Sequence, residues 1–272
     1  MNHPYLSKMK ARGQITSIPE LASIVSKSLL IDAPVRQAVI LAAGKGTRLD
    51  PVTKTIPKPM IEVHGRPILE HLIEYFREHG VFDIIMSVGH LQHVIRDHFG
   101  DGHAHGVHIT FIDNADLPGS AGVLVSAEPY LDDHFIVTNS DEFKDLNLHM
   151  LMRTHLDSKS IGTLGITIVE DPTQYGVVDL DGHHIKRFVE KPSIDEAPSN
   201  WINAGIYAFS RDVLGFIPPH RPTMTERDVF PQLAAEGKLI GHRFNGQWFD
   251  TGTPERLEKT RAEWKGYSFT RV

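Results

Sequence analysis

The chain has 272 residues, 40% hydrophobic and 23% charged, so it can bury a sizeable core in one large domain or one domain with a lobe. Its formal net charge of −6 argues against a broad polyanion-binding surface, so we expect neither nucleic acid nor an acidic membrane as a partner. The absence of cysteine excludes disulfides and thiolate metal sites, and no apolar run reaches the roughly 18 residues of a spanning helix. We therefore expect a cytoplasmic protein with a small-molecule partner.

Residues 1–36 precede the first predicted strand and form an N-terminal extension. Ser17 and Glu20 have the spacing of a capping box, and Pro19 suits a first helical turn. An apolar stripe follows at helical spacing. These features predict a short amphipathic helix that packs on the main domain or on a second subunit.

From residue 38 onward, strand and helix patterns alternate. Strands are predicted at 38–41, 83–89, 107–112 and 135–138, and helices at 68–76, 94–99, after 122, and at 149–155. A strand-rich stretch follows at 161–169, 176–180, 185–190 and 202–209, with helices at 228–236 and 254–264. The pattern predicts a three-layer α/β/α, Rossmann-like, mostly parallel sheet with a β-rich lobe growing from the same sheet. Ligands of such sheets bind at the carboxyl ends of the strands.

The stretch 37–60, QAVILAAGKGTRLDPVTKTIPKPM, begins with a predicted strand and continues into a glycine turn. Gly44 and Gly46 let the backbone fold back and present N–H groups to an anion, and Arg48 and Lys58 add positive charge. The spacing does not fit a Walker loop. It does not fit a dinucleotide fingerprint either, because Leu49 stands where that motif has its third glycine. By itself the stretch is equally typical of an anion-binding loop of another type and of a plain strand-to-helix turn.

Residues 44–59 resemble, without a gap, the signature G-x-G-T-R-L-x-P-x-T-x-x-x-P-K-P of the sugar-1-phosphate nucleotidyltransferases. Further segments resemble that family's N-G-D, F-x-E-K-P, N-x-G-I-Y and W-x-D-x-G-T-P-E motifs, at 139–141, 188–192, 203–207 and 248–255. The resemblance runs from about 37 to 264 and implies a nucleotidyltransferase catalytic domain at 37–265, with a tail at 266–272. Ser140 replaces the glycine of N-G-D, and serine is disfavoured at positive φ, so the turn is expected either to have a different shape or to tolerate a small side chain.

The resemblance implies a reaction in which a sugar 1-phosphate attacks the α-phosphorus of a nucleoside triphosphate and expels pyrophosphate. The implied catalytic residues are Arg48, Lys58 and Lys191. The implied nucleotide-binding residues are Leu41, Ala42, Ala43, Gly44, Gly46, Thr47, Arg48, Lys58, Gly119 and Ser120. The implied sugar-phosphate-binding residues are Gly176, Glu190, Lys191 and Asn203. Asp141 and Asp250 are the implied ligands of a Mg²⁺ cofactor, which suits two hard carboxylates that share the ion with phosphate oxygens.

The base and the sugar are less well determined. The loop 117–122, LPGSAG, resembles the L-G-T-A-G loop of mannose-1-phosphate guanylyltransferases, so the first hypothesis is GTP with mannose 1-phosphate. The second is dTTP or UTP with glucose 1-phosphate, and the third is a guanylyl enzyme for a heptose phosphate. A catalytically silent homologue that binds a sugar nucleotide, and a cytidylyltransferase for a non-sugar phosphate, are further alternatives. Family resemblance implies a homodimer.

Overall fold

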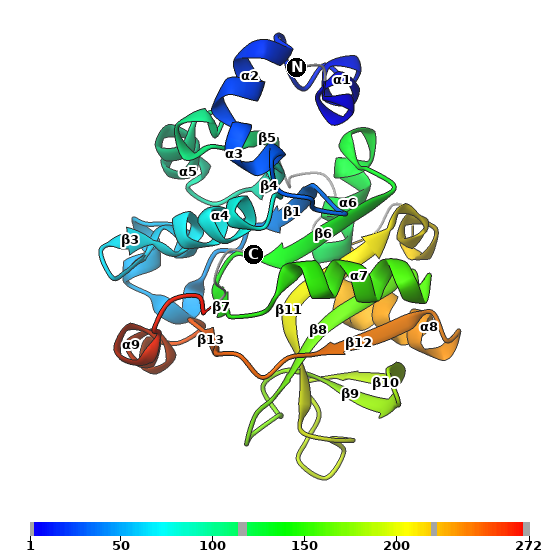
Figure 1. The fold of residues 1–272 in the computed structure, drawn as a ribbon. Coiled ribbons are helices and arrows are strands. Elements are labelled where there is room, and N and C mark those ends of the chain that lie inside the picture. The colour runs from blue at the N-terminus through cyan, green and yellow to red at the C-terminus, as the bar shows by residue number, and fades with distance from the viewer. Residues whose placement is uncertain (1–2, 114–118, 219–221, 269–272) are drawn as a thin grey trace.

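The computed structural model describes residues 3–113, 119–218 and 222–268 of the chain (Figure 1). Its main feature is a nine-stranded sheet in the order β5-β4-β1-β6-β11-β8-β12-β10-β9. The strands of this sheet are β1 (Gln37–Leu41), β4 (Asp83–Val88), β5 (His108–Asp113), β6 (His134–Asn139), β8 (Gly162–Ile168), β9 (Gly176–Asp181), β10 (His184–Glu190), β11 (Trp201–Ser210) and β12 (Leu239–Arg243). The N-terminal helices and the β9–β10 hairpin lie at opposite ends of the molecule in Figure 1.

The sheet is mixed. The predicted parallel order is confirmed for β5, β4, β1 and β6, which run side by side in the same direction. Strand β12 is also parallel to β8, but β11 is antiparallel to β6 and β8, and β10 is antiparallel to β9 and β12, so the predicted mostly parallel order does not hold past β6. The connection between β9 and β10 is only a two-residue turn, Gly182 and His183, and such a short turn can join only antiparallel strands. The β-rich lobe is therefore a continuation of the same sheet, as predicted.

Helices cover both faces of the sheet. On one face lie α4 (Ile68–Glu78), α5 (Gln92–Phe99) and α7 (Leu148–Ser158), and on the other lie α6 (Ser120–Ala127) and α8 (Phe230–Ala235). Successive side chains of a strand point to opposite faces, so Ala38 and Ile40 join the first core whereas Val39 joins the second. The apolar run of β1 is explained by burial on both sides.

The extension forms three short helices, α1 (Pro4–Ala11), α2 (Ile18–Ile24) and α3 (Ser26–Leu29), where the sequence predicted one. The predicted capping box is not formed, because the side chain of Ser17 makes no capping hydrogen bond. Buried apolar side chains of α1 and α2 belong to the same core as α4 and β4. The extension therefore packs on the main domain, which was one of the two arrangements predicted for it.

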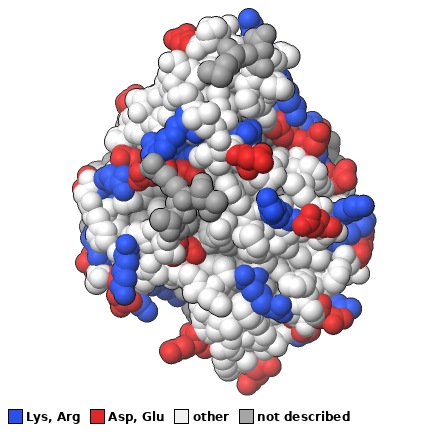
Figure 2. Space-filling model, viewed as in Figure 1, with Lys and Arg blue, Asp and Glu red and all other residues white. Residues whose placement is uncertain are grey.

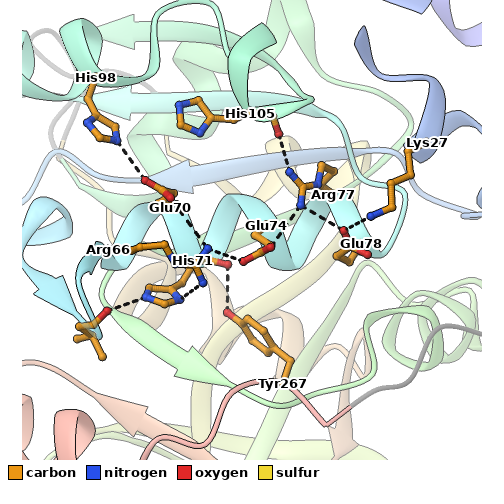
Figure 3. Close-up of polar contacts among 11 residues, drawn as sticks. Lys27, Arg66, Glu70, His71, Glu74, Arg77, Glu78, His98, His105 and Tyr267 are labelled. Atoms are coloured by element: carbon orange, nitrogen blue, oxygen red, sulfur yellow. Dashed lines mark hydrogen bonds and ion pairs between the residues drawn. The ribbon is translucent and has the colours of Figure 1, made fainter. Parts of the chain in front are cut away.

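Helix α4 contacts both ends of the chain (Figure 3). Lys27 of the extension lies 2.6 Å from the carboxylate of Glu78, and the hydroxyl of Tyr267 donates to the backbone oxygen of His71 at 3.3 Å. The ring of Tyr267 also stacks on Tyr75, with centroids 5.0 Å apart. Exposed ion pairs contribute little, so the aromatic packing is the stronger contact. Tyr267 belongs to the predicted tail, and it packs on the domain.

Two smaller strand pairs lie outside the main sheet. One pairs β2 (Glu62–Val63) with β3 (Arg66–Pro67), and the other pairs β7 (Glu142–Lys144) with β13 (Trp248–Asp250). Helix α9 (Pro254–Glu263) follows, and Thr253 caps it as predicted, with its hydroxyl accepting from the backbone N–H of Arg256 at 3.4 Å. Short 3₁₀ and π turns complete the fold at Thr47–Leu49, Val52–Lys54, Lys58–Met60, His103–His105, Glu128–Tyr130, Arg211–Phe216 and Thr225–Val229.

Positive and negative side chains are interspersed over the face drawn in Figure 2. Within the ranges that the structure describes, no helix combines the length and apolar character that crossing a bilayer requires.

Candidate active site

The sheet brings the phosphate loop and the predicted metal residues to one edge. Strands β1 and β6 are parallel neighbours, with Leu41 opposite Asn139 at their carboxyl ends. The glycine loop leaves one strand there, and Asp141 follows the other. The β7–β13 pair then places Asp250 opposite Glu142, so the two predicted metal carboxylates come from segments more than a hundred positions apart in the sequence and meet at one site.

Two adjoining cavities open at this edge. The first has a volume of about 340 Å³ and is lined by Leu41, Gly44, Gly46, Thr47, Arg48, Lys58, Pro59, Asn139, Ser140, Asp141 and Gly252. The second has a volume of about 380 Å³ and is lined by Arg48, Asn139, Asp141, Glu142, Gln174, Tyr175, Gly176, Glu190, Lys191, Asn203, Met224, Glu226, Arg227, Asp250 and Arg256. Arg48, Asn139 and Asp141 line both, so the cavities share a wall.

Most of the predicted site residues line these cavities, but four do not. The first cavity takes in most of the predicted nucleotide-binding residues, and the second takes in all four of the predicted sugar-phosphate-binding residues. The residues found in neither lining are Ala42, Ala43, Gly119 and Ser120. The Ser120 hydroxyl instead contacts the side chains of Thr225 and Glu226, at 2.8 and 2.9 Å. Residues 117 and 118 of the predicted base-binding loop lie outside the described residues.

Close packing in the glycine loop explains why position 46 is a glycine. Gly46 has φ of 65°, and a Cβ added there would lie 2.9 Å from the Cβ of Lys58. A side chain at this position would be strained and would push Lys58 away from the cavity. Ser140 is not among the non-glycine residues with positive φ in the described chain, so serine fits the N-S-D turn without the backbone strain that the sequence suggested.

Asp141 is paired with Lys58. The Lys58 ammonium donates to the Asp141 carboxylate, and their side chains are 9% and 30% exposed. Burial acts to raise the pKa of the Asp141 carboxyl, but Lys58, together with Lys144 and Arg48, outweighs it and holds the pKa below its ordinary value. Asp141 is therefore ionised at neutral pH, as a metal ligand or a phosphate-positioning carboxylate requires.

Asp250 accepts three hydrogen bonds. The hydroxyl of Tyr175 donates to its Oδ2 at 2.7 Å, and Arg256 and the backbone N–H of Gly252 donate to its Oδ1 at 3.1 and 2.9 Å. A Cβ on Gly252 would lie 2.8 Å from Asp250 and 3.3 Å from the guanidinium of Arg48, so these two charged groups lie side by side. Arg48 and both aspartates thus line the same cavity.

A buried pair that the sequence analysis missed lies beneath the carboxylates. Lys144 is 1% exposed, lies 3.3 Å from the carboxylate of Glu142, and donates to the hydroxyl of Thr138 at 3.0 Å. Burial raises the pKa of Glu142 to about 7, against the opposing effect of Lys144. The signal was available, because residues 142 and 144 have the i, i+2 spacing that puts two side chains on one face of a strand.

Gly205 leaves room for the Glu142 carboxylate. Its φ is 64°, and a Cβ added there would lie 1.9 Å from Oε2 of Glu142. The N-x-G-I-Y segment therefore needs its glycine both for backbone conformation and for space beside the acidic cluster.

The predicted sugar-phosphate-binding residues line the second cavity. Lys191 has positive φ, 49°, and its ammonium lies 3.4 Å from Glu190 with the side chain 54% exposed. Burial raises the pKa of Glu190. The Asn203 amide donates to the hydroxyl of Tyr207 at 2.9 Å. Lys191 and Arg227 are thus two exposed cations of this cavity, and Glu190 beside Lys191 is a carboxylate that can accept hydrogen bonds.

The carboxylates of this site suit magnesium only if phosphate oxygens of a substrate supply further ligands to the ion. Asp141 and Asp250 supply hard carboxylate oxygens to one cavity, but no group of three or more metal-ligating side chains occurs in the part of the chain that the structure describes. Mg²⁺ commonly binds through one or two carboxylates plus phosphates and water, so this sparse set is compatible with it. One oxygen of the neighbouring Glu142 is buried without a hydrogen-bond partner among the described residues.

The fold of this chain is shared with solved structures of other proteins. A structure of UDP-glucose pyrophosphorylase complexed with UDP-glucose has the same fold, with a TM-score of 0.74 and 21% sequence identity, covering 85% of this chain and 98% of that one. Residues 37–265 match the Nucleotidyl transferase family, and the chain belongs to that family.

Curated relatives carry two different names. The chain is 38% identical to a UTP–glucose-1-phosphate uridylyltransferase of Synechocystis over 79% of its own length and 60% of the relative's. It is also 38% identical to the mannose-1-phosphate guanylyltransferase catalytic subunit beta of Danio rerio, over 80% of its own length and 62% of the relative's. The chain thus spans about three-fifths of the length of the curated relatives it matches.

Proposed function

We propose that this chain joins a sugar 1-phosphate to the nucleoside monophosphate part of a nucleoside triphosphate and releases pyrophosphate, with GTP and mannose 1-phosphate as the preferred pair. The observation that carries the proposal is the shared wall of the two cavities, where Arg48 and Asp141 face both. The first cavity has the loop and lysine suited to a triphosphate. The second has a lysine and a carboxylate suited to a sugar phosphate.

The proposed work of the protein is to bring two anions together. A phosphate monoester is already a competent nucleophile, so no serine, cysteine or histidine base is required. Arg48 and Lys58 would hold the triphosphate and offset the charge that builds up on the departing pyrophosphate. Lys191 would hold the incoming phosphate, while Glu190 and Asn203 orient the sugar ring. Each role matches a group that lines the corresponding cavity.

Asp141 and Asp250 are the residues that would hold Mg²⁺. The bound ion would supply charge neutralisation between the reacting phosphates. Lys58 and Arg256 neutralise the two carboxylates in the free protein. This arrangement holds the two carboxylates at one cavity before any ligand arrives.

The choice of GTP rests on the small-residue loop at 117–122 and remains the first of three hypotheses. The small residues of this loop would let its backbone approach a purine edge, but Gly119 and Ser120 line neither cavity, and Gly119 packs against the backbone of Thr223. The Synechocystis relative's name supports the second hypothesis, UTP or dTTP with glucose 1-phosphate. A heptose phosphate is the third.

A substrate matrix tests the proposal. The purified chain is incubated with magnesium, each of GTP, UTP, dTTP and CTP, and each of mannose, glucose and heptose 1-phosphate, and pyrophosphate release is followed. We expect the highest kcat/KM with GTP and mannose 1-phosphate. Activity with dTTP or UTP alone would reject that pair but keep the reaction class. Binding of a sugar nucleotide with no pyrophosphate release in any mixture would favour a silent regulatory homologue.

The homodimer and the cytoplasmic location stay predictions. Light scattering coupled to size-exclusion chromatography would give the mass in solution, and twice the chain mass of 30.5 kDa would support the dimer. Cell fractionation would test the location.

A further inference from the structure

Arg256 is a cation of the second cavity that no sequence motif singled out. It lies in the first turn of α9, three residues after the cap, and its Nη1 donates to Oδ1 of Asp250 at 3.1 Å. Its guanidinium sits over the ring of Tyr175, 5.1 Å from the centroid. The side chain is 28% exposed and lines the same cavity as Lys191. It is therefore partly buried, held from two sides, and directed into the cavity.

The guanidinium has unused donors in this position. An arginine carries five N–H donors in a planar fork that matches phosphate oxygens, whereas a lysine offers a point charge. Within the described residues, Nη1 is the only guanidinium nitrogen of Arg256 that donates a hydrogen bond. Lys191, the cation assigned to the sugar phosphate, is mostly exposed. Arg227, another cation of this cavity, is exposed as well, and exposed cations hold a dianionic phosphate loosely.

Asp250 links Arg256 to ligand binding. This carboxylate also accepts from Tyr175 and from a backbone N–H, so it keeps its place if Arg256 turns away. When Asp250 is engaged with magnesium, the guanidinium no longer has the full negative charge of its partner, and phosphate oxygens in the same cavity can replace it. The face of Tyr175 can continue to support the guanidinium through a cation–π contact.

We propose that Arg256 is a phosphate-binding residue for the incoming sugar 1-phosphate, held on Asp250 in the free protein and passed to the phosphate in the complex. This inference rests on the proposed function for the identity of the ligand. It adds to the site, beside Lys191, a partly buried cation that can bind phosphate in a bidentate geometry.

Calorimetric titration without nucleotide tests the inference independently of turnover. Mannose 1-phosphate, glucose 1-phosphate and inorganic phosphate are each titrated into the protein in the presence of MgCl₂. We expect Arg256→Gln to weaken binding of the favoured sugar phosphate by about ten- to a hundredfold, because a hydrogen bond to a charged group is lost. Arg256→Lys should recover part of the affinity, since it restores the charge but not the fork.

Two controls separate phosphate binding from indirect effects. Lys259→Gln removes the same charge from an exposed position of the same helix outside both cavities, and it should leave the affinity unchanged. Tyr175→Phe removes a hydrogen bond to Asp250 without removing a cation, and it should weaken sugar-phosphate binding by less than about threefold. Equal affinities of the wild type and Arg256→Gln, including no measurable binding by either, would overturn the inference. So would an equal loss in Tyr175→Phe, because Arg256 would then act only through Asp250.

Steady-state kinetics give a second readout. We expect Arg256→Gln to raise KM for the sugar phosphate at least tenfold while KM for the triphosphate changes less than twofold. A rise confined to the triphosphate would contradict the assignment. If the wild type releases no pyrophosphate with any substrate pair, the proposed function fails, but the calorimetric comparison still decides whether Arg256 binds phosphate.

Discussion

The Lys58–Asp141 pair offers a way to separate the structural role of the site from its catalytic role. Lys58 is 7% exposed as a residue, and Asp141 is its direct ion-pair partner. Asp141→Asn would leave a nearly buried ammonium without its partner. Breaking a buried pair in this way typically costs 3 to 5 kcal/mol, and the 30% exposure of the Asp141 side chain places this case at the lower end, about 3 kcal/mol.

The double variant Lys58→Met/Asp141→Asn should recover much of that stability, because the uncompensated charge is removed together with its partner. We expect a coupling energy of about 2 kcal/mol from a double-mutant cycle measured by urea denaturation. Turnover should not recover. Both Asp141→Asn and the double variant should lose at least about a hundred- to a thousandfold in kcat, the typical effect of removing one electrostatic group from a phosphate-transfer site.

Two results would refute this reasoning. Additive stability effects, with a coupling energy below about 0.5 kcal/mol, would mean that the pair is not energetically linked. Near-normal pyrophosphate release by Asp141→Asn would mean that this carboxylate takes no part in the reaction. The two readouts are independent, so each can fail separately.

Three further predictions follow from single residues. Arg48→Ala should lose at least about a hundredfold in kcat in the pyrophosphate assay, and near-normal turnover would remove it from the site. Gly205→Ala should lose at least about 1 to 2 kcal/mol of unfolding free energy, measured in urea, because of the positive φ alone. Displacing the Glu142 carboxylate should cost more. An unchanged midpoint of urea unfolding would contradict the close packing of Gly205 against Glu142. Burial, with a contribution from a neighbouring histidine, lowers the pKa of His155 from 6.5 to about 4. Between these pH values the unfolded chain binds more protons at this residue than the folded chain does. The free energy of unfolding should therefore fall by about 3 kcal/mol as pH drops from 6.5 to 4. His155→Gln should flatten this acid dependence, whereas His93→Gln, at an exposed position, should not.

The strand and helix pattern was predictable because the apolar periodicities are strong. Helix α4 has apolar side chains at helical spacing, and β1 and β4 are continuous apolar runs, so their types and positions agree with the structure. Helix α1 was missed because it is short and weakly amphipathic, and its stability comes from burying Leu6 and Met9 against the domain. The antiparallel pairing of β11 with β6 and β8 was missed because strand direction there depends on pairing between distant segments.

The candidate site was predictable to a similar extent. Local motifs identified Arg48, Lys58, Asp141, Lys191 and Asp250, and the cavities are lined by all five. They did not identify the partners that these residues hold in the folded chain. No local pattern indicates that Asp250 will lie beside Tyr175 and Arg256, since its place depends on the pairing of β7 with β13.

The sequence by itself determined that this chain has a glycine loop, a set of cations and two separated carboxylates, because each lies within a short segment whose local geometry its own residues dictate. Only the tertiary structure decided which of these groups meet. The pairing of β1 with β6 and of β7 with β13 brings distant charges within a few ångströms of one another. The cost of that convergence is offset by ion pairs between Lys58 and Asp141 and between Arg256 and Asp250, which exist only once the chain has folded.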